Sequence, residues 1–167
     1  MVYSEYLNAA RKHYATCEAL KTTILGLDLV KAPDKVNNKH FRLNLYYLTG
    51  YIFECSIKYG IYKLVNHDLK TPINELNVPG IDFANDIKKH RFDRYSEHLI
   101  VRHAGIKLVD DRNSVPPEVV KLYNSWDAPV RYLYNDSKPL SYSMLENKHL
   151  FTFLDCAREV LKTVERL

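Results

Sequence analysis

Apolar and aromatic residues follow a helical spacing through residues 41–65. One row recurs at intervals of three and four positions, at Phe41, Leu45, Leu48, Ile52, Cys55, Tyr59 and Tyr62. A second row lies beside it, at Tyr46, Phe53, Ile57, Ile61 and Leu64. A helix with two apolar rows must pack against partners on two sides. The pattern therefore predicts that this helix is the centre of a helical bundle.

The same spacing predicts a long helix that precedes the central one. It runs from Ser4, which is a suitable N-cap, to about Leu27, with Gly26 near its end. Pro33 and the pair Asn37-Asn38 then mark a loop in which the chain reverses. We expect this first helix to pack along the central one.

After the central helix the chain becomes polar. Residues 66–80 are a connector, and residues 81–90 form a short segment whose pattern favours no particular structure. A helix is predicted over residues 94–104, with Asp93 as its N-cap and Gly105 as a left-handed terminator.

A further helix is predicted from Pro116 and Pro117, since proline suits the first turn. Its inner face would consist of Val119, Leu122, Tyr123 and Trp126. Pro129 predicts a kink, or a restart capped by Asp127, before residues 130–134.

The last helix is predicted to begin near Ser143, where Ser143 and Glu146 form a capping box, and to continue to the C-terminus. Alternation typical of strands is nowhere sustained, and there is no internal repeat or domain-sized linker. The expected fold is all-α, a single-domain bundle of about five helices in 167 residues.

Composition changes this picture little. The formal charge is +4, from 24 basic and 20 acidic residues, which permits contact with nucleic acid without requiring it. The 13 tyrosines suit packing that reaches the surface and also stacking on unpaired bases.

The three cysteines are widely spaced and odd in number, which indicates buried thiols in a reducing compartment. Apolar runs are too short to cross a bilayer and residues 1–20 lack a signal-peptide layout, so we expect a cytoplasmic protein with no membrane association.

Three stretches resemble the HEPN superfamily of helical domains. The run GYIFECSIKYGIY, residues 50–62, is similar to its second helix, in which a small residue, a glutamate and a lysine four positions later recur. The run KHRFDRYSEHLIVRHAGI, residues 89–106, is similar to a segment that begins with histidine and ends in Ala-Gly and an aliphatic residue. Trp126, followed by Arg131 and Tyr132, resembles a later helix of the family. The resemblance spans roughly residues 46–134.

The resemblance implies a metal-independent endoribonuclease that acts as a homodimer on RNA, in a defence or toxin-antitoxin setting. In such enzymes an arginine and a histidine a few residues downstream perform the chemistry. Arg91 and His98 have that order here, and His90 and Tyr95 lie near enough in sequence to contact base or phosphate. Histidine can move the proton of a ribose 2′-hydroxyl, and arginine can neutralise charge on the phosphorane.

Two departures from the family pattern leave a non-catalytic alternative open. Phe92, rather than asparagine or aspartate, follows Arg91. Arg131 lies where the family's later arginine is expected, but the next histidine is His149. A chain of this kind would bind RNA through Arg131, or serve as a helical interaction module for a protein or nucleotide partner.

The remaining polar residues have structural explanations. Glu54 and Lys58 are spaced for an ion pair within the central helix, and Arg131 could instead pair with Glu54 or Asp127. No cluster of His, Cys, Asp or Glu has metal-ligand spacing, and no glycine-rich phosphate loop occurs, so neither a metal nor another cofactor is expected.

Overall fold

The computed structural model describes residues 1–92, 95–103, 105–109, 115–132 and 145–167. Within these residues the chain forms helices and no strand, which confirms the all-α prediction. The α-helices are α1 Ser4–Leu25, α2 Ala32–Leu64, α3 Ser96–Arg102, α4 Pro117–Asn124 and α5 Asn147–Val164. Three shorter helical segments lie between them: η1 Ile73–Glu75, η2 Phe83–Ile87, which is a π-helix, and η4 Ala128–Tyr132.

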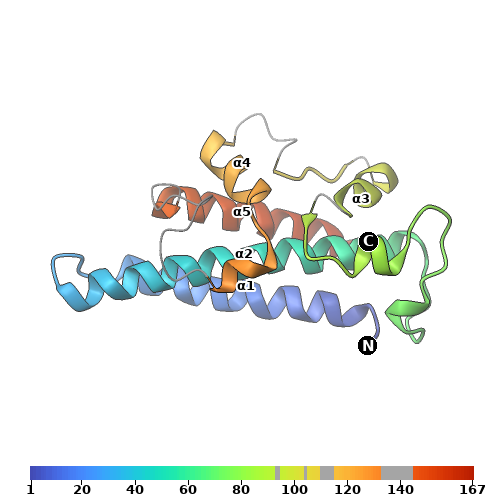
Figure 1. Ribbon diagram of the computed structural model, residues 1–167, viewed down its shortest axis with the longest axis horizontal. Helices are drawn as coiled ribbons and strands as arrows, with labels where there is room; N and C mark the ends of the chain where they lie inside the picture. The colour runs from blue at the N-terminus through green and yellow to red at the C-terminus, as the bar shows by residue number, and fades with distance from the viewer. Residues whose placement is uncertain (93–94, 104, 110–114, 133–144) are drawn as a thin grey trace.

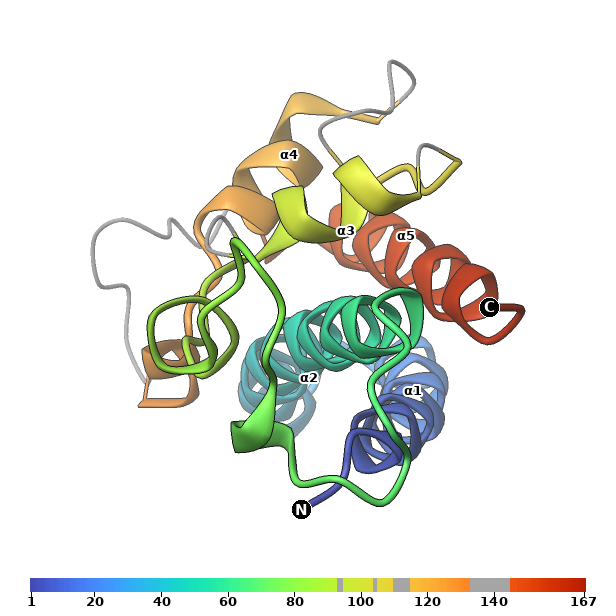
Figure 2. The same ribbon diagram turned by 90° about the vertical axis from the view of Figure 1, so that its right-hand side faces the viewer.

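Helix α2 is the centre of the bundle, as its two apolar rows predict. Figure 2 shows α1 and α5 on one side of α2 and η4 on the other, with α3 and α4 above; the green segment that follows α2 passes the end of α1 before it reaches the side of η4. Buried residues occur in both rows, among them Leu45 and Ile52 in the first and Phe53 and Ile57 in the second. None of the described helices is long and apolar enough to cross a membrane.

Helix α2 begins at Ala32, so the prediction of a loop at Asn37-Asn38 is wrong. Pro33 lies in the first turn, where a missing N–H has no intrahelical partner to lose. Asp34, also in that turn, accepts a hydrogen bond from the backbone N of Asp28 at 2.9 Å. The extension makes α1 and α2 a long antiparallel hairpin whose turn projects at the left of Figure 1.

Other predicted helix ends differ from the structure in detail. Ser4 is the first residue of α1 rather than its cap, and α3 ends against His103 without a left-handed glycine at Gly105. Asp93 and Ser143 lie outside the described residues, and Glu146 precedes α5 without a side-chain capping bond. Helix α4 ends at Asn124, so Trp126 lies beyond the helix whose inner face it was predicted to join. The chain becomes helical again at η4, as Pro129 predicts, and Asp127 Oδ1 accepts from the backbone N of Ala128, the first residue of η4, at 2.7 Å.

Candidate functional site

An open cleft of about 790 Å³ lies beside α2, between two segments that are distant in the sequence. One wall is formed by η2 and the residues after it, and the other by η4. The lining residues are Ala84, Asn85, Lys88, Lys89, His90, Arg91, Asp127, Ala128, Pro129, Arg131 and Tyr132. We call this feature the basic cleft.

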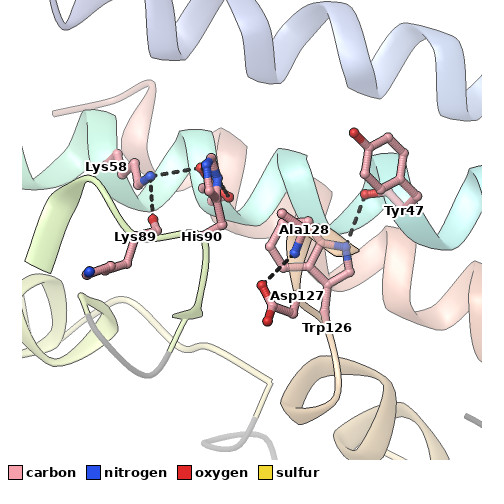
Figure 3. Close-up of polar contacts among 8 residues, drawn as sticks. Tyr47, Lys58, Lys89, His90, Trp126, Asp127 and Ala128 are labelled. Atoms are coloured by element: carbon pink, nitrogen blue, oxygen red, sulfur yellow. Dashed lines mark hydrogen bonds and ion pairs between the residues drawn. The ribbon is translucent and has the colours of Figure 1, made fainter. Parts of the chain in front are cut away.

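Trp126 attaches the η4 wall to the central helix. Its indole Nε1 donates to the backbone carbonyl of Tyr47 at 3.1 Å (Figure 3), and the ring lies against Gly50. The ring of Phe92 stacks on the indole, with centroids 4.7 Å apart and planes 4° from parallel. Phe92 directly follows Arg91 of one wall, and Trp126 directly precedes Asp127 of the other. The stacked pair therefore links the two walls.

A buried ion pair attaches the other wall. Lys58 Nζ lies 2.8 Å from Glu54 Oε1, and their side chains are 3% and 4% exposed. Lys58 also donates to the backbone carbonyl of Lys89 at 2.8 Å, and its ammonium lies 5.0 Å from the ring centre of Tyr95. Figure 3 shows Lys58 on the face of α2 that is turned toward Lys89 and His90. The pair is therefore buried and in contact with residues 89–90. The helical spacing of the two residues would equally suit an ion pair on the surface.

His90 contacts the buried Glu54–Lys58 pair and also lines the cleft. Its Nδ1 lies 3.0 Å from Glu54 Oε1 and 3.2 Å from Oε2, and its side chain is 53% exposed. A carboxylate paired with an ammonium can only accept hydrogen bonds, so Nδ1 carries the proton in this contact. The ring is fixed in one orientation, and Nε2 is the nitrogen left for a molecule in the cleft.

The charge in the cleft is mainly positive. Four lining side chains are cations at neutral pH, Lys88, Lys89, Arg91 and Arg131, against the single carboxylate of Asp127. The guanidinium of Arg131 lies 4.6 Å from the ring centre of Tyr132, which is 73% exposed. A hydrogen bond to the Tyr47 hydroxyl raises the pKa of Arg131 and holds its guanidinium near α2. The cleft can therefore attract anions and offers an exposed aromatic ring beside a cation.

The structure brings together three of the residues singled out from the sequence. His90, Arg91 and Arg131 all line the basic cleft, and Arg131 is exposed rather than paired with Glu54, whose carboxylate is occupied by Lys58 and His90.

Two other candidates lie elsewhere. His98 is not among the residues that line the cleft, and its Nε2 is 3.5 Å from Asp86 Oδ2. Tyr95 is fully buried beneath Lys58, so the expectation that it contacts RNA is not met by this arrangement.

Sequence reasoning missed Lys88, Lys89 and Tyr132 as site residues. The signal for the first two was present, since residues 88–91 read Lys-Lys-His-Arg, the densest basic run near the predicted motif. Tyr132 was noted only for its place after Arg131, since nothing in the sequence around it indicates which tyrosines stay exposed. Among the described residues, no three His, Cys, Asp or Glu side chains are grouped to hold a metal ion.

No protein-family model, curated protein or solved structure matches the chain.

Proposed function

We propose that the basic cleft binds single-stranded RNA. The observation that carries this proposal is that one open cleft is lined by the basic run of residues 88–91 on one wall and by Arg131 and Tyr132 on the other. Both walls are attached to α2, through the hydrogen bonds of Lys58 and Trp126. Lys88, Arg91 and Arg131 would contact phosphates, as cations do in sequence-tolerant nucleic-acid sites. The exposed ring of Tyr132 would stack on a base.

A nucleic acid fits the cleft better than a small anion. A free phosphate needs only a compact nest of donors, whereas this cleft is open and has cations along two walls. The Tyr132 ring with Arg131 beside it adds an apolar and cationic surface of the kind that binds unpaired bases. The choice of RNA rather than DNA, together with a cytoplasmic role in defence, rests on the resemblance of residues 50–62 and 89–106 to HEPN domains.

Fluorescence anisotropy with a labelled unstructured RNA tests the proposal. Arg131→Gln with Lys88→Gln should weaken binding and flatten the dependence of log K on log salt concentration by about 0.7 for each phosphate that the protein no longer neutralises. Arg11→Gln is the control, because Arg11 pairs with Glu165 outside the lining of the cleft. Equal affinity and equal salt slopes for wild type and the double variant would reject RNA binding at this cleft.

A second candidate function is that of a helical module that binds a protein partner, including a second copy of the chain. It is favoured by the exposed apolar side chains near the α1–α2 turn, Leu25 (64%), Leu29 (49%), Val30 (95%) and Val36 (56%). Sedimentation velocity on wild type and Val30→Asp would detect the homodimer that the resemblance implies. A monomer at every concentration in both proteins would contradict self-association through this turn.

A further inference from the structure

We propose that Asp127 makes the basic cleft selective for guanine, so that the RNA strands bound most tightly are those that place a guanine against the η4 wall. This proposal rests on the proposed function, because it names the base that the RNA-binding cleft prefers. Contacts to phosphate position a nucleic acid without reading its sequence, whereas contacts to base edges provide specificity. Asp127 is placed to supply a contact of the second kind.

Asp127 has an acceptor oxygen that the protein does not use. Its side chain is partly buried and lines the cleft. Oδ1 accepts from the backbone N of Ala128 at 2.7 Å, which fixes the carboxylate at the start of η4, and Figure 3 shows the second oxygen directed away from Ala128. Within the described part of the chain, this second oxygen, Oδ2, forms no hydrogen bond and no ion pair. It is therefore available to a molecule in the cleft.

Asp127 does not neutralise a neighbouring cation. Arg131, the nearest cation along the chain, is hydrogen-bonded to the Tyr47 hydroxyl and lies over the ring of Tyr132. Asp127 is also unsuited to contact phosphate, because both groups are anions and neither has a hydrogen to donate. A carboxylate among the cations of this cleft therefore suits a different part of the ligand, one that donates hydrogen bonds.

Guanine is the base whose edge matches this acceptor best. Its Watson–Crick edge carries two adjacent donors, N1–H and the 2-amino group, which can pair with the two oxygens of one carboxylate. Adenine and cytosine offer one amino group beside an acceptor nitrogen, and uracil offers one N–H between two carbonyl oxygens. Oδ1 can take part although it already accepts from Ala128, because a carboxylate oxygen accepts more than one hydrogen bond. Recognition of unpaired bases through this edge is the common mode for single-stranded RNA.

Other lining residues suit the rest of the same base. Tyr132 lies on the same wall as Asp127, and its exposed ring, with the guanidinium of Arg131 beside it, offers a surface for stacking. The opposite wall carries Lys88 and Lys89. Guanine O6 and N7 are acceptors to which lysine and arginine commonly donate. Guanine thus combines two donors for the carboxylate with two acceptors for the cations.

Fluorescence anisotropy with labelled RNA octamers that differ at one position tests the preference. The set contains octauridine and three octamers in which one central uridine is replaced by guanosine, inosine or 1-methylguanosine. We expect the wild type to bind the guanosine octamer on the order of 10-fold more tightly than octauridine. Inosine, which lacks the 2-amino group, should give an intermediate affinity. The octamer with 1-methylguanosine, which lacks N1–H, should bind no more tightly than octauridine.

Asp127→Asn separates base recognition from folding. Asparagine can keep an oxygen for the N–H of Ala128 and then presents its amide nitrogen, a donor, in place of Oδ2. The variant should lose the preference for guanosine yet bind octauridine at least as tightly as the wild type, because one negative charge has left the cleft. Weaker binding of both RNAs would overturn the assignment by showing that Asp127 acts only through the fold.

Asp155→Asn is the matched control. It removes the same charge from α5, where Asp155 pairs with Arg158 outside the lining of the cleft. This variant should keep the wild-type preference for guanosine. A loss of preference equal to that of Asp127→Asn would overturn the assignment.

The outcomes distinguish this proposal from the proposed function. Absence of binding to every octamer in the wild type would reject the proposed function itself. Equal affinity for octauridine and the guanosine octamer, or an unchanged preference in Asp127→Asn, would leave RNA binding standing and overturn the guanine assignment. GMP presents the same base with a single phosphate and should compete only weakly. Binding of GMP as tight as that of the guanosine octamer would keep the guanine site and reject RNA as its ligand.

Discussion

Gly50 is the position at which the indole of Trp126 rests on the central helix. A Cβ placed on Gly50 would overlap the indole atoms Nε1, Cε2 and Cδ1. The close approach also brings Nε1 within 3.1 Å of the Tyr47 carbonyl. Glycine weakens a helix in isolation. Within α2, however, Gly50 leaves the space that Trp126 needs to pack against the helix, and Trp126 attaches the η4 wall of the basic cleft.

Gly50→Ala is predicted to destabilise the protein although alanine is the better helix former. Alanine would contribute up to about 1 kcal/mol through helix propensity. Displacing the indole should cost more, for a net loss of roughly 1–3 kcal/mol in the free energy of unfolding. Urea unfolding measures this loss. RNA affinity should also fall, because a displaced Trp126 would move the η4 wall of the cleft.

Gly26→Ala is the matched control for that change. Gly26 has φ −86° and follows α1, and a Cβ placed there meets no atom nearer than 3.6 Å. Alanine should therefore be neutral or stabilise by up to about 1 kcal/mol. If the two substitutions had equal effects, the close contact of Trp126 with Gly50 would be refuted.

Glu54→Ala is predicted to cost about 3–5 kcal/mol of unfolding free energy. The substitution leaves the Lys58 ammonium, 3% exposed, without its carboxylate. Replacing both residues, as Glu54→Leu with Lys58→Met, should recover most of the stability, since a buried ion pair can be exchanged for apolar residues of similar size. Chemical denaturation of the single and double variants gives both values.

An exposed pair provides the comparison for Glu54. Glu159 and Lys162 lie 3.6 Å apart with side chains 47% and 50% exposed. Glu159→Ala should change stability by no more than about 1 kcal/mol. A cost of Glu54→Ala that is no larger than this would show that the buried cluster does not fasten residues 89–90 to α2.

Stability is predicted to fall as the pH rises above about 9, in part because of two buried thiols. Buried tyrosines such as Tyr6 and Tyr62 add to the loss near pH 10, because burial raises their pKa from the ordinary value of 10.0. Burial raises the pKa of Cys17 and of Cys55 to about 12, from an ordinary value of 9.0. Between these values the unfolded chain loses protons that the folded chain retains, so each thiol contributes a loss of up to about 1.4 kcal/mol per pH unit. Unfolding curves at pH 8 and pH 10 measure the loss.

Cys17→Ala should make this pH dependence shallower. The variant removes one of the two thiols that stay protonated in the folded state, and the tyrosine hydroxyls ionise in the unfolded chain only near pH 10 and above. Identical pH slopes for wild type and Cys17→Ala would show that the Cys17 thiol does not contribute.

The periodicity of residues 41–65 predicted the centre of the fold correctly because apolar rows on two faces leave few alternatives. The N-terminal extension of α2 was not predictable in this way. Pro33 and Asn37-Asn38 favour a turn locally, and the burial of Asn38, at 8% exposure, depends on neighbours distant in the chain.

Sequence patterns also predicted some of the site residues but not their grouping. His90, Arg91 and Arg131 were candidates from the motif, yet their meeting in one cleft depends on the bond from Trp126 to Tyr47, across 79 positions. The separation of His98 from the cleft has a local cause that spacing does not reveal: α3 begins only at Ser96, and His98 lies against Asp86 of η2.

The central claim is that RNA binds in the basic cleft, and photochemical cross-linking tests it most directly. A single-stranded RNA carrying 4-thiouridine would be irradiated with the wild-type protein, and the linked peptides identified by mass spectrometry. The predicted result is cross-links within residues 88–91 and 127–132, with Tyr132 prominent. Cross-links confined to a different basic surface, such as the cavity lined by Lys35, Lys39 and Arg42 on α2, would contradict the claim.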